Sequence, residues 1–362
     1  MVHVALERPG AALYDAIAIE PFGPAALVTH GADPVSQPSV RDAGPLGPEV
    51  GVTRIWVTPF SGSTEAPLVL PVRVSGLAAE PEGEILVSDA RSGTIWRLGV
   101  GTGTVALAVT AARGQQEPAT RGPLAPAGLA VSPDGSLWVA DPPGHRVWAI
   151  APDGVPRLVV GGASGYRDGP IADAMFRFPR DVAVADDGTC YVADTGNHCI
   201  RAIAPDGTVR TVAGSIYDYG DGLGREARFR RPEAIDVSHD GTCYVADTGN
   251  HAIRRISPNG EVTTVAGEPP GGDCDGVGRG VGLRWPTGIA LGADGSIWVA
   301  DHGNSAVRRI DAQGSSTTML RRNDECWPAF VARRGTAVIV AATAASDDHV
   351  SQACLVALGR DR

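Results

Sequence analysis

The chain has 362 residues, of which 43% are hydrophobic and 20% are charged, and this balance excludes an intrinsically disordered protein. Its formal net charge of −10 argues against nucleic-acid binding, because that function needs clustered lysine and arginine to displace the counterions of the phosphate backbone. The 47 glycines and 28 prolines suit many short strands joined by tight turns better than long helices.

The N-terminal segment shows no targeting signal. Glu7 and Arg8 interrupt its apolar residues, so the sequence predicts no signal peptide, and no apolar run is long enough to cross a bilayer. The six cysteines, at positions 190, 199, 243, 274, 326 and 354, form no Cys-x-x-Cys pair. Cys190 and Cys243 occupy the same position of a repeat, which indicates small packing residues. We therefore expect a reduced, cytoplasmic protein that binds neither a membrane nor nucleic acid.

A repeated unit occupies the chain from about residue 76 to residue 320. Its copies open with GLAAEPEG from Gly76, GLAVSPDG from Gly128, DVAVADDG from Asp181, AIDVSHDG from Ala234 and GIALGADG from Gly288. An aspartate follows in each copy, at positions 89, 141, 194, 247 and 301, with spacings of 52, 53, 53 and 54 residues. Self-similarity at this period is typical of stacked repeats that cannot bury their apolar faces alone.

Each unit predicts four short β-strands. The first, such as 182–185, is a nearly continuous apolar run, as expected for a strand buried on both faces. After a turn that contains glycine, the second strand carries one bulky ring that we expect to fill the wedge between neighbouring units: Trp138, Tyr191, Tyr244 and Trp298. Two further turns lead to the third and the outer strand. These elements predict an all-β propeller of four-stranded antiparallel blades, which removes exposed sheet edges by closing on itself.

The segments YVADTGNHCIRAI, from Tyr191, and YVADTGNHAIRRI, from Tyr244, resemble the NHL repeat, which is named for its Asn-His-Leu signature. Here the signature stands as Asn197-His198-Cys199-Ile200 and Asn250-His251-Ala252-Ile253. The resemblance is specific, because several offsets match in several copies, and it weakens at both ends of the chain. It implies a β-propeller, and it implies that a protein or peptide partner is a reasonable expectation.

Seven blades are favoured, and six remain open. A first-strand candidate near Asp15 begins a diverged unit, and another near Ala329 begins a last unit that supplies only three strands. The N-terminal residues 2–6 are expected to add the outer strand of that last unit and to close the ring as one domain, 1–362. The predicted blades are 15–75, 76–127, 128–180, 181–233, 234–287, 288–328, and 329–362 with 1–14.

The interblade loops end beside the central channel, so their last residues are expected to line its mouth. Function concentrates on loops held by a rigid scaffold, and a concave mouth with a few polar groups is the default ligand site. The candidate catalytic residues are Asp181, Glu233 and His30, which stands where other units carry the marker aspartate. The candidate ligand-binding residues are Arg177, Arg180, Arg230, Arg284, Trp285, Thr287 and Trp327.

Residues that recur in several copies are expected to maintain the repeat. The marker aspartates should accept backbone hydrogen bonds in their turns, and the histidines at positions 145, 198 and 251 should pack or bond to a turn carbonyl. For His30, a structural or surface role competes with a role in a site.

The sequence makes no cofactor evident. Lyases similar to NHL proteins that cleave peptidyl-α-hydroxyglycine hold a zinc ion with three histidines, and His30 matches one ligand position. The inner strands begin with Asp181, Glu233 and Thr287 where the other histidines would stand, so a three-histidine zinc site is not supported. A divalent cation held by carboxylates, as in the similar six-bladed sugar lactonases, stays open without support from ligand spacing.

Two functions stay open. In the first, the channel mouth binds a small molecule or a peptide, and the protein is an enzyme of the lyase, isomerase or hydrolase type. In the second, the loop face binds another protein or a peptide without catalysis. The fold cannot decide between them. The first is slightly favoured, because the end blades have diverged where a site could develop.

Overall fold

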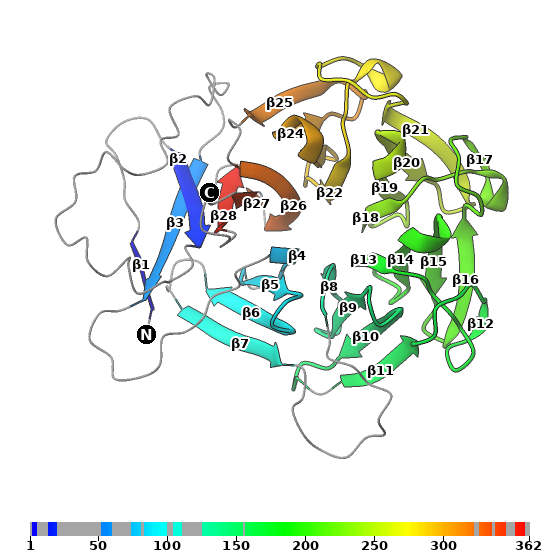
Figure 1. Cartoon of the computed structure of the whole chain (residues 1–362), viewed down its shortest axis with the longest axis horizontal. Helices are drawn as coiled ribbons and strands as arrows, with labels where there is room; N and C mark the ends of the chain where they lie inside the picture. Colours follow the sequence, from blue (N-terminus) through cyan, green and yellow to red (C-terminus); the bar gives the residue numbers. More distant parts are fainter. Residues whose placement is uncertain are drawn as a thin grey trace.

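The computed structural model of the chain describes residues 2–5, 14–19, 52–59, 74–80, 83–99, 104–110, 125–154, 156–321, 326–334, 337–344 and 352–358. Its sheets are arranged like the blades of a propeller around a central channel (Figure 1). The predicted all-β propeller with antiparallel blades is therefore confirmed.

Five sheets are blades of the repeating type. Blade 1 contains β4 (Val74–Ala79), β5 (Ile85–Asp89), β6 (Thr94–Gly99) and β7 (Thr104–Thr110). Blade 2 contains β8 (Leu129–Val131), β9 (Leu137–Asp141), β10 (Arg146–Ile150) and β11 (Pro156–Gly161). Blade 5 contains β22 (Pro286–Leu291), β23 (Ile297–Asp301), β24 (Ala306–Ile310) and β25 (Ser316–Arg321). In each blade the first strand lies innermost and the fourth outermost.

Blades 3 and 4 each gain a fifth, two-residue strand from the interblade loop in front of them. Blade 3 contains β13 (Pro179–Val184), β14 (Cys190–Asp194), β15 (Cys199–Ile203), β16 (Thr208–Ala213) and, outside it, β12 (Gly169–Pro170). Blade 4 contains β18 (Pro232–Val237), β19 (Cys243–Asp247), β20 (Ala252–Ile256), β21 (Glu261–Gly267) and β17 (Gly222–Leu223). The loops thus wrap over the outer edge of a blade before the chain enters its inner strand.

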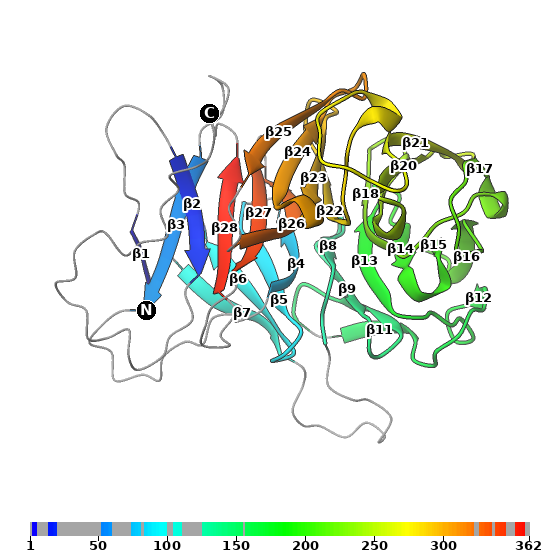
Figure 2. The same ribbon diagram turned by 45° about the horizontal axis from the view of Figure 1, so that its top comes forward.

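The sixth position in the ring is filled by a sheet that combines both ends of the chain. Its order is β26 (Cys326–Arg334), β27 (Ala337–Ala344), β28 (Gln352–Leu358), β2 (Tyr14–Ile19), β3 (Val52–Pro59) and β1 (Val2–Ala5), and Figure 2 shows its strands side by side. Its inner strand β26 contacts both β22 and β4, which completes the circle.

The prediction of seven blades is wrong, because the two end units do not form separate blades. β2, expected to be an inner strand near Asp15, pairs with β28 instead and lies away from the channel. The N-terminal strand β1 is the outermost strand of this sheet, as expected, but it pairs with β3. An apolar strand without the marker aspartate carries no signal of its place within a blade, which explains the error.

The cores lie between blades, as the wedge residues predicted. Trp138 packs against a core shared by blades 2 and 3, Tyr191 against that of blades 3 and 4, and Tyr244 against that of blades 4 and 5. Trp298 belongs to the core between blade 5 and the sixth sheet. Each blade is therefore held by its two neighbours.

Helix is confined to single 3-10 turns in the described ranges, such as η3 (Thr195–Asn197), η4 (Gly224–Glu226), η5 (Thr248–Asn250), η6 (Gly278–Gly280) and η7 (His302–Asn304). None of these could cross a bilayer. Cys190, Cys199 and Cys243 are buried free thiols and Cys274 is an exposed one. Cys190 and Cys243 are packing residues of two interblade cores, as predicted.

Candidate functional site: the channel mouth

A buried ion-pair cluster recurs after the second strand of three blades. In blade 4, Asp247 Oδ2 accepts hydrogen bonds from Arg254 Nη1 and Asn250 Nδ2, both at 2.8 Å, and Oδ1 accepts the Arg230 backbone N–H at 2.7 Å. Blades 3 and 5 repeat it with Asp194–Asn197–Arg201 and Asp301–Asn304–Arg308. These aspartates accept backbone hydrogen bonds as predicted. The donor, however, lies in the interblade loop and not in the aspartate's own turn.

The recurring histidines position the loop residues that precede each inner strand. His251 Nδ1 accepts the backbone N–H of Trp285 at 3.0 Å, and Trp285 has a φ of 47°, which non-glycine residues rarely adopt. His145 binds Phe178 and His198 binds Arg231 in the same way. The expected turn-carbonyl partner is thus replaced by an N–H of the next loop. Burial, followed by nearby arginines, lowers the pKa of His251, which favours the neutral form that accepts this bond.

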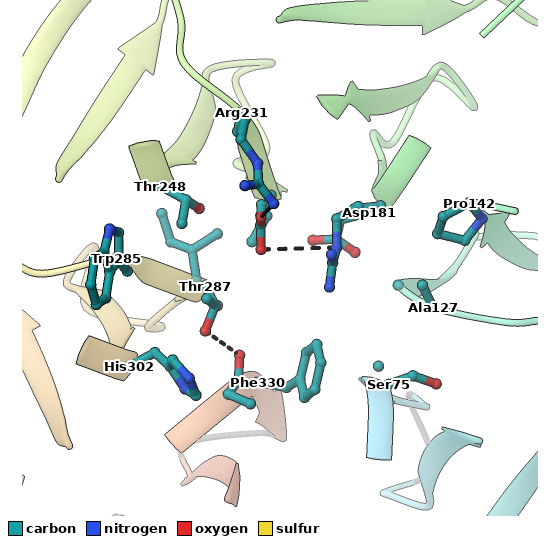
Figure 3. Close-up of a pocket in the computed structure, with 18 of the residues that line it drawn as sticks. Ser75, Ala127, Pro142, Asp181, Arg231, Thr248, Trp285, Thr287, His302 and Phe330 are labelled. Atoms are coloured by element: carbon teal, nitrogen blue, oxygen red, sulfur yellow. Dashed lines mark hydrogen bonds and ion pairs between the residues drawn. The ribbon is translucent and has the colours of Figure 1, made fainter. Parts of the chain in front are cut away.

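Five inner strands contain a β-bulge close to their first residue, at the channel mouth. The pairing register between the first and second strands shifts at five residues: Ser75, Arg180, Glu233, Thr287 and Ala329. A bulge of this kind leaves one residue unpaired and redirects its side chain. With the equivalent residue of blade 2, these positions form a ring around the mouth, which we call the bulge ring: Ser75, Ala127, Arg180, Glu233, Thr287 and Ala329. The interblade loops therefore deliver one side chain per blade to the same opening (Figure 3).

Two further rings lie deeper in the channel. The second ring directly follows the bulge ring and consists of Gly76, Gly128, Asp181, Ala234, Gly288 and Phe330. The third ring, two residues further on, consists of Ala78, Ala130, Ala183, Asp236, Ala290 and Ala332. Among these deeper positions only Asp181 and Asp236 are ionisable. The small residues leave space, and the two aspartates interrupt an otherwise apolar wall.

The bulge and second rings enclose a mouth cavity of about 910 Å³. A second cavity of about 710 Å³ opens towards the other end of the channel, and Asp181 borders both. Volumes of this size suit small organic ligands. Figure 3 shows Arg231, Asp181, Thr287 and Phe330 around the centre of the mouth cavity.

One carboxylate faces two guanidinium groups at the mouth. Glu233 Oε1 lies 3.2 Å from Arg231 Nη2, and Glu233 Oε2 lies 3.9 Å from Arg180 Nε. The Glu233 side chain is only 10% exposed, whereas those of Arg180 and Arg231 are 45% and 58% exposed. The two arginines therefore keep part of their hydrogen-bonding surface open to the cavity.

Asp181 and Asp236 share an arrangement in which each carboxylate reaches the next blade. Asp181 Oδ2 accepts the N–H of Ile235 at 2.9 Å, and Asp236 Oδ2 accepts the N–H of Leu291 at 2.8 Å. Burial among the inner strands raises the pKa of Asp181 to about 7 and that of Asp236 to about 6, against the lowering effect of these bonds. Asp181 can therefore exchange a proton near neutral pH.

The structure brings together six of the ten candidate site residues. Arg180, Asp181, Arg230, Glu233, Trp285 and Thr287 line the mouth cavity. Arg177 and Arg284 do not line it, although their backbone N–H groups bind marker aspartates just as that of Arg230 does. His30 lies outside the described residues. Trp327 lies in β26, and its side chain is likewise outside the described part.

Sequence reasoning missed Arg231, Tyr217, Phe330 and Asp236. Arg231 and Tyr217 lie in the interblade loop in front of blade 4, from which the sequence had singled out only Arg230 and Glu233. Asp236 could have been found from the sequence, because in an alignment of the inner strands it occupies the position at which the others have alanine. For the ends of the chain no such alignment was possible.

The NHL repeat model matches residues 125–150, 176–203 and 283–310 of the chain, which cover parts of blades 2, 3 and 5. The chain is a β-propeller that contains NHL repeats. Among curated relatives, it is 31% identical to Protein SUPPRESSOR OF QUENCHING 1 of Arabidopsis thaliana, over 46% of the chain and 17% of that protein. It is 28% identical to Teneurin-3 of Danio rerio, over 66% of the chain and 11% of that protein. The NHL propeller thus matches less than a fifth of either relative.

A solved structure of virginiamycin B lyase from Staphylococcus aureus with quinupristin is similar, with a TM-score of 0.55 over 98% of both chains and 15% sequence identity. At this identity the likeness establishes the fold alone. Within the described ranges of this NHL propeller, no three His, Cys, Asp or Glu side chains are grouped so that they could hold a metal ion.

Proposed function

We propose that this NHL propeller binds a small molecule in the mouth cavity and acts on it as a lyase, isomerase or hydrolase. The observation that carries the proposal is the break in the rings: at positions where other blades place Gly, Ala, Ser or Thr, blades 3 and 4 place Arg180, Asp181 and Glu233. Side chains that maintain a repeat recur in it, whereas these three do not.

Asp181 is the proposed proton-transfer group. It borders the cavity, and its pKa of about 7 suits a residue that takes up and releases a proton at neutral pH. Arg180 and Glu233 would orient the ligand above it.

The test compares stability with binding. In Arg180→Ala, Asp181→Asn and Glu233→Ala variants we expect the melting temperature to stay within about 3 °C of the wild type. We expect ligands found by NMR screening of a fragment library to lose most of their affinity in the Arg180 and Asp181 variants and to show a changed affinity in the Glu233 variant. Arg210→Ala, on the outer strand β16, is the matched control. Unchanged affinities in all three mouth variants would contradict the proposal.

A second function has one observation in its favour. Phe178, Tyr217 and Trp285 on the loop face are 48%, 49% and 53% exposed, and aromatic side chains commonly anchor peptide partners. In that case Trp285→Ser should abolish binding to peptides selected from a random library, while Asp181→Asn leaves it unchanged.

A further inference from the structure

Three hydroxyls and one imidazole of the mouth cavity already interact with backbone carbonyl groups. Ser75 Oγ donates to the Pro126 carbonyl at 2.6 Å, Thr248 Oγ1 to the Pro286 carbonyl at 2.6 Å, and Thr287 Oγ1 to the Ala329 carbonyl at 2.9 Å. His302 Nδ1 lies 3.0 Å from the Pro328 carbonyl oxygen. These groups have little capacity left to recognise a neutral polar ligand.

The guanidinium groups are the main donors that remain. A guanidinium carries five N–H donors, and among the described residues the side chains of Arg180 and Arg231 have Glu233 as their one ion-pair partner. A ligand group placed between them must therefore accept hydrogen bonds. Arg230 is less available, because its Nε donates to the Tyr217 hydroxyl and its guanidinium stacks on the Tyr217 ring at 4.7 Å.

The local charge favours an anion. The described lining of the mouth cavity contains four arginines, at positions 91, 180, 230 and 231, and two carboxylates, Asp181 and Glu233. This excess of positive charge stands out in a chain with a net charge of −10. A cleft lined by one sign of charge concentrates ligands of the opposite sign.

Across the channel from Arg231 the wall is largely apolar, with Arg91 of blade 1 as its one charged residue in the described lining. Gly76, Ala127, Gly128 and Phe330 line it, and Figure 3 shows Ala127 and Phe330 on the far side of the opening from Arg231. An added Cβ at Gly128 would lie 1.9 Å from Asp181 Oδ1, so glycine is required where the wall meets this carboxylate. The cavity therefore has a cationic side at Arg180, Arg230 and Arg231 and a largely apolar side opposite Arg231.

We infer that the mouth cavity binds a small organic acid, with its carboxylate or phosphate oxyanion between the guanidinium groups of Arg180 and Arg231 and its organic part against the wall of Gly76, Ala127, Gly128 and Phe330. This inference rests on the proposed function and names its ligand class. Glu233 holds the two guanidinium groups in place but competes with the ligand for them. Removal of its charge should therefore strengthen binding, while removal of either arginine should weaken it.

Isothermal titration calorimetry with four matched probes tests the inference: benzoate, phenyl phosphate, benzyl alcohol and benzylamine. We expect the two anions to bind, the alcohol to bind weakly and the amine not to bind. Arg180→Gln and Arg231→Gln should each weaken the anions by about tenfold or more, and Glu233→Gln should tighten them by several-fold. Arg210→Gln, an exposed arginine of β16, should change nothing.

The two sources of the oxyanion give different pH profiles. A phosphate monoester gains its second charge near pH 6, so the affinity of phenyl phosphate should rise relative to that of benzoate between pH 5 and pH 8. The probe with the tighter binding at pH 8 identifies the better class of ligand.

Two failures are distinguishable. Tight binding of the alcohol or the amine, unaffected by both arginine substitutions, would overturn the inference and leave the proposed function standing. If no probe binds, and a fragment library of mixed charge also yields no ligand sensitive to substitutions at the mouth, both are overturned.

Discussion

Blade 4 and the channel mouth beside it use the same residue types in different ways. In the blade, Asp247 and Arg254 are both fully buried and meet at 2.8 Å, and the pair recurs in the neighbouring blades. At the mouth, Glu233 is nearly buried, but its arginine partners are half-exposed, one lies 3.9 Å away, and no other blade has the arrangement. In a repeat protein, the recurrence of a fully buried ion pair marks a structural role. A departure from the repeat with incomplete pairing marks a candidate site.

The largest expected difference is in stability. Asp247→Ala removes the fully buried one of the two carboxylates that pair with the guanidinium of Arg254 and leaves only the partly exposed Asp221, so it should lower the free energy of unfolding by about 3 kcal/mol. Glu233→Ala should lower it by less than about 1 kcal/mol, because the arginines that it leaves behind can be hydrated. Urea denaturation of both variants measures the contrast. Equal losses would remove the distinction between the two regions.

Replacement of the Asp181 carboxylate should raise the free energy of unfolding instead of lowering it. Its pKa is raised to about 7 in the folded state, so its contribution to stability is fully present below about pH 4 and is lost as the pH rises through 7. Asp181→Asn mimics the protonated form and keeps an acceptor for the N–H of Ile235. The variant should match the wild type at pH 4 and be more stable at pH 8, by roughly 2 kcal/mol after allowance for water in the channel.

Thermal unfolding at the two pH values checks this, with the exposed-loop variant Asp173→Asn as control. A loss of stability at pH 8 would show that the ionised carboxylate of Asp181 is structural. A gain of stability at pH 8 together with a loss of ligand binding would show that Asp181 lowers the stability of blade 3 but is needed for function.

The smallest expected effect concerns the histidines that connect the two regions. The folded-state pKa of His251 is lowered, so its contribution to stability is present above pH 6.5 and is lost as the pH falls through the folded pKa. Asn tolerates positive φ and offers an acceptor oxygen for the N–H of Trp285. His251→Asn should therefore keep its stability at pH 7.5 and lose less stability than the wild type between pH 7.5 and pH 5. Identical pH profiles of the two proteins would contradict this role.

The sequence was most informative where the repeat is regular. The 53-residue period and the wedge residues Tyr191 and Tyr244 placed the strands and the interblade cores, because one unit explains several others. The ends could not be predicted this way. The sixth sheet joins β2 to β28 across more than 300 residues, and β2 to β3 in parallel, and neither pairing leaves a local pattern.

Part of the site could also be predicted from the position of residues relative to the inner strands. Arg180, Glu233 and Thr287 were placed at the mouth because they directly precede inner strands, and the bulges there turn them towards the channel. Arg177 and Arg284 looked equivalent to Arg230, and all three donate a backbone N–H to a marker aspartate, but only Arg230 lines the cavity. The Arg230 guanidinium lies over the Tyr217 ring, a tertiary contact that the repeat pattern did not predict.

A crystal structure of the protein soaked with phenyl phosphate and benzoate tests the central claim most directly. The account predicts probe density inside the mouth cavity, with the oxyanion between the Arg180 and Arg231 guanidinium groups and the ring towards Phe330. Probe density confined to the outer edges of the blades, with the mouth cavity holding only solvent, would contradict it.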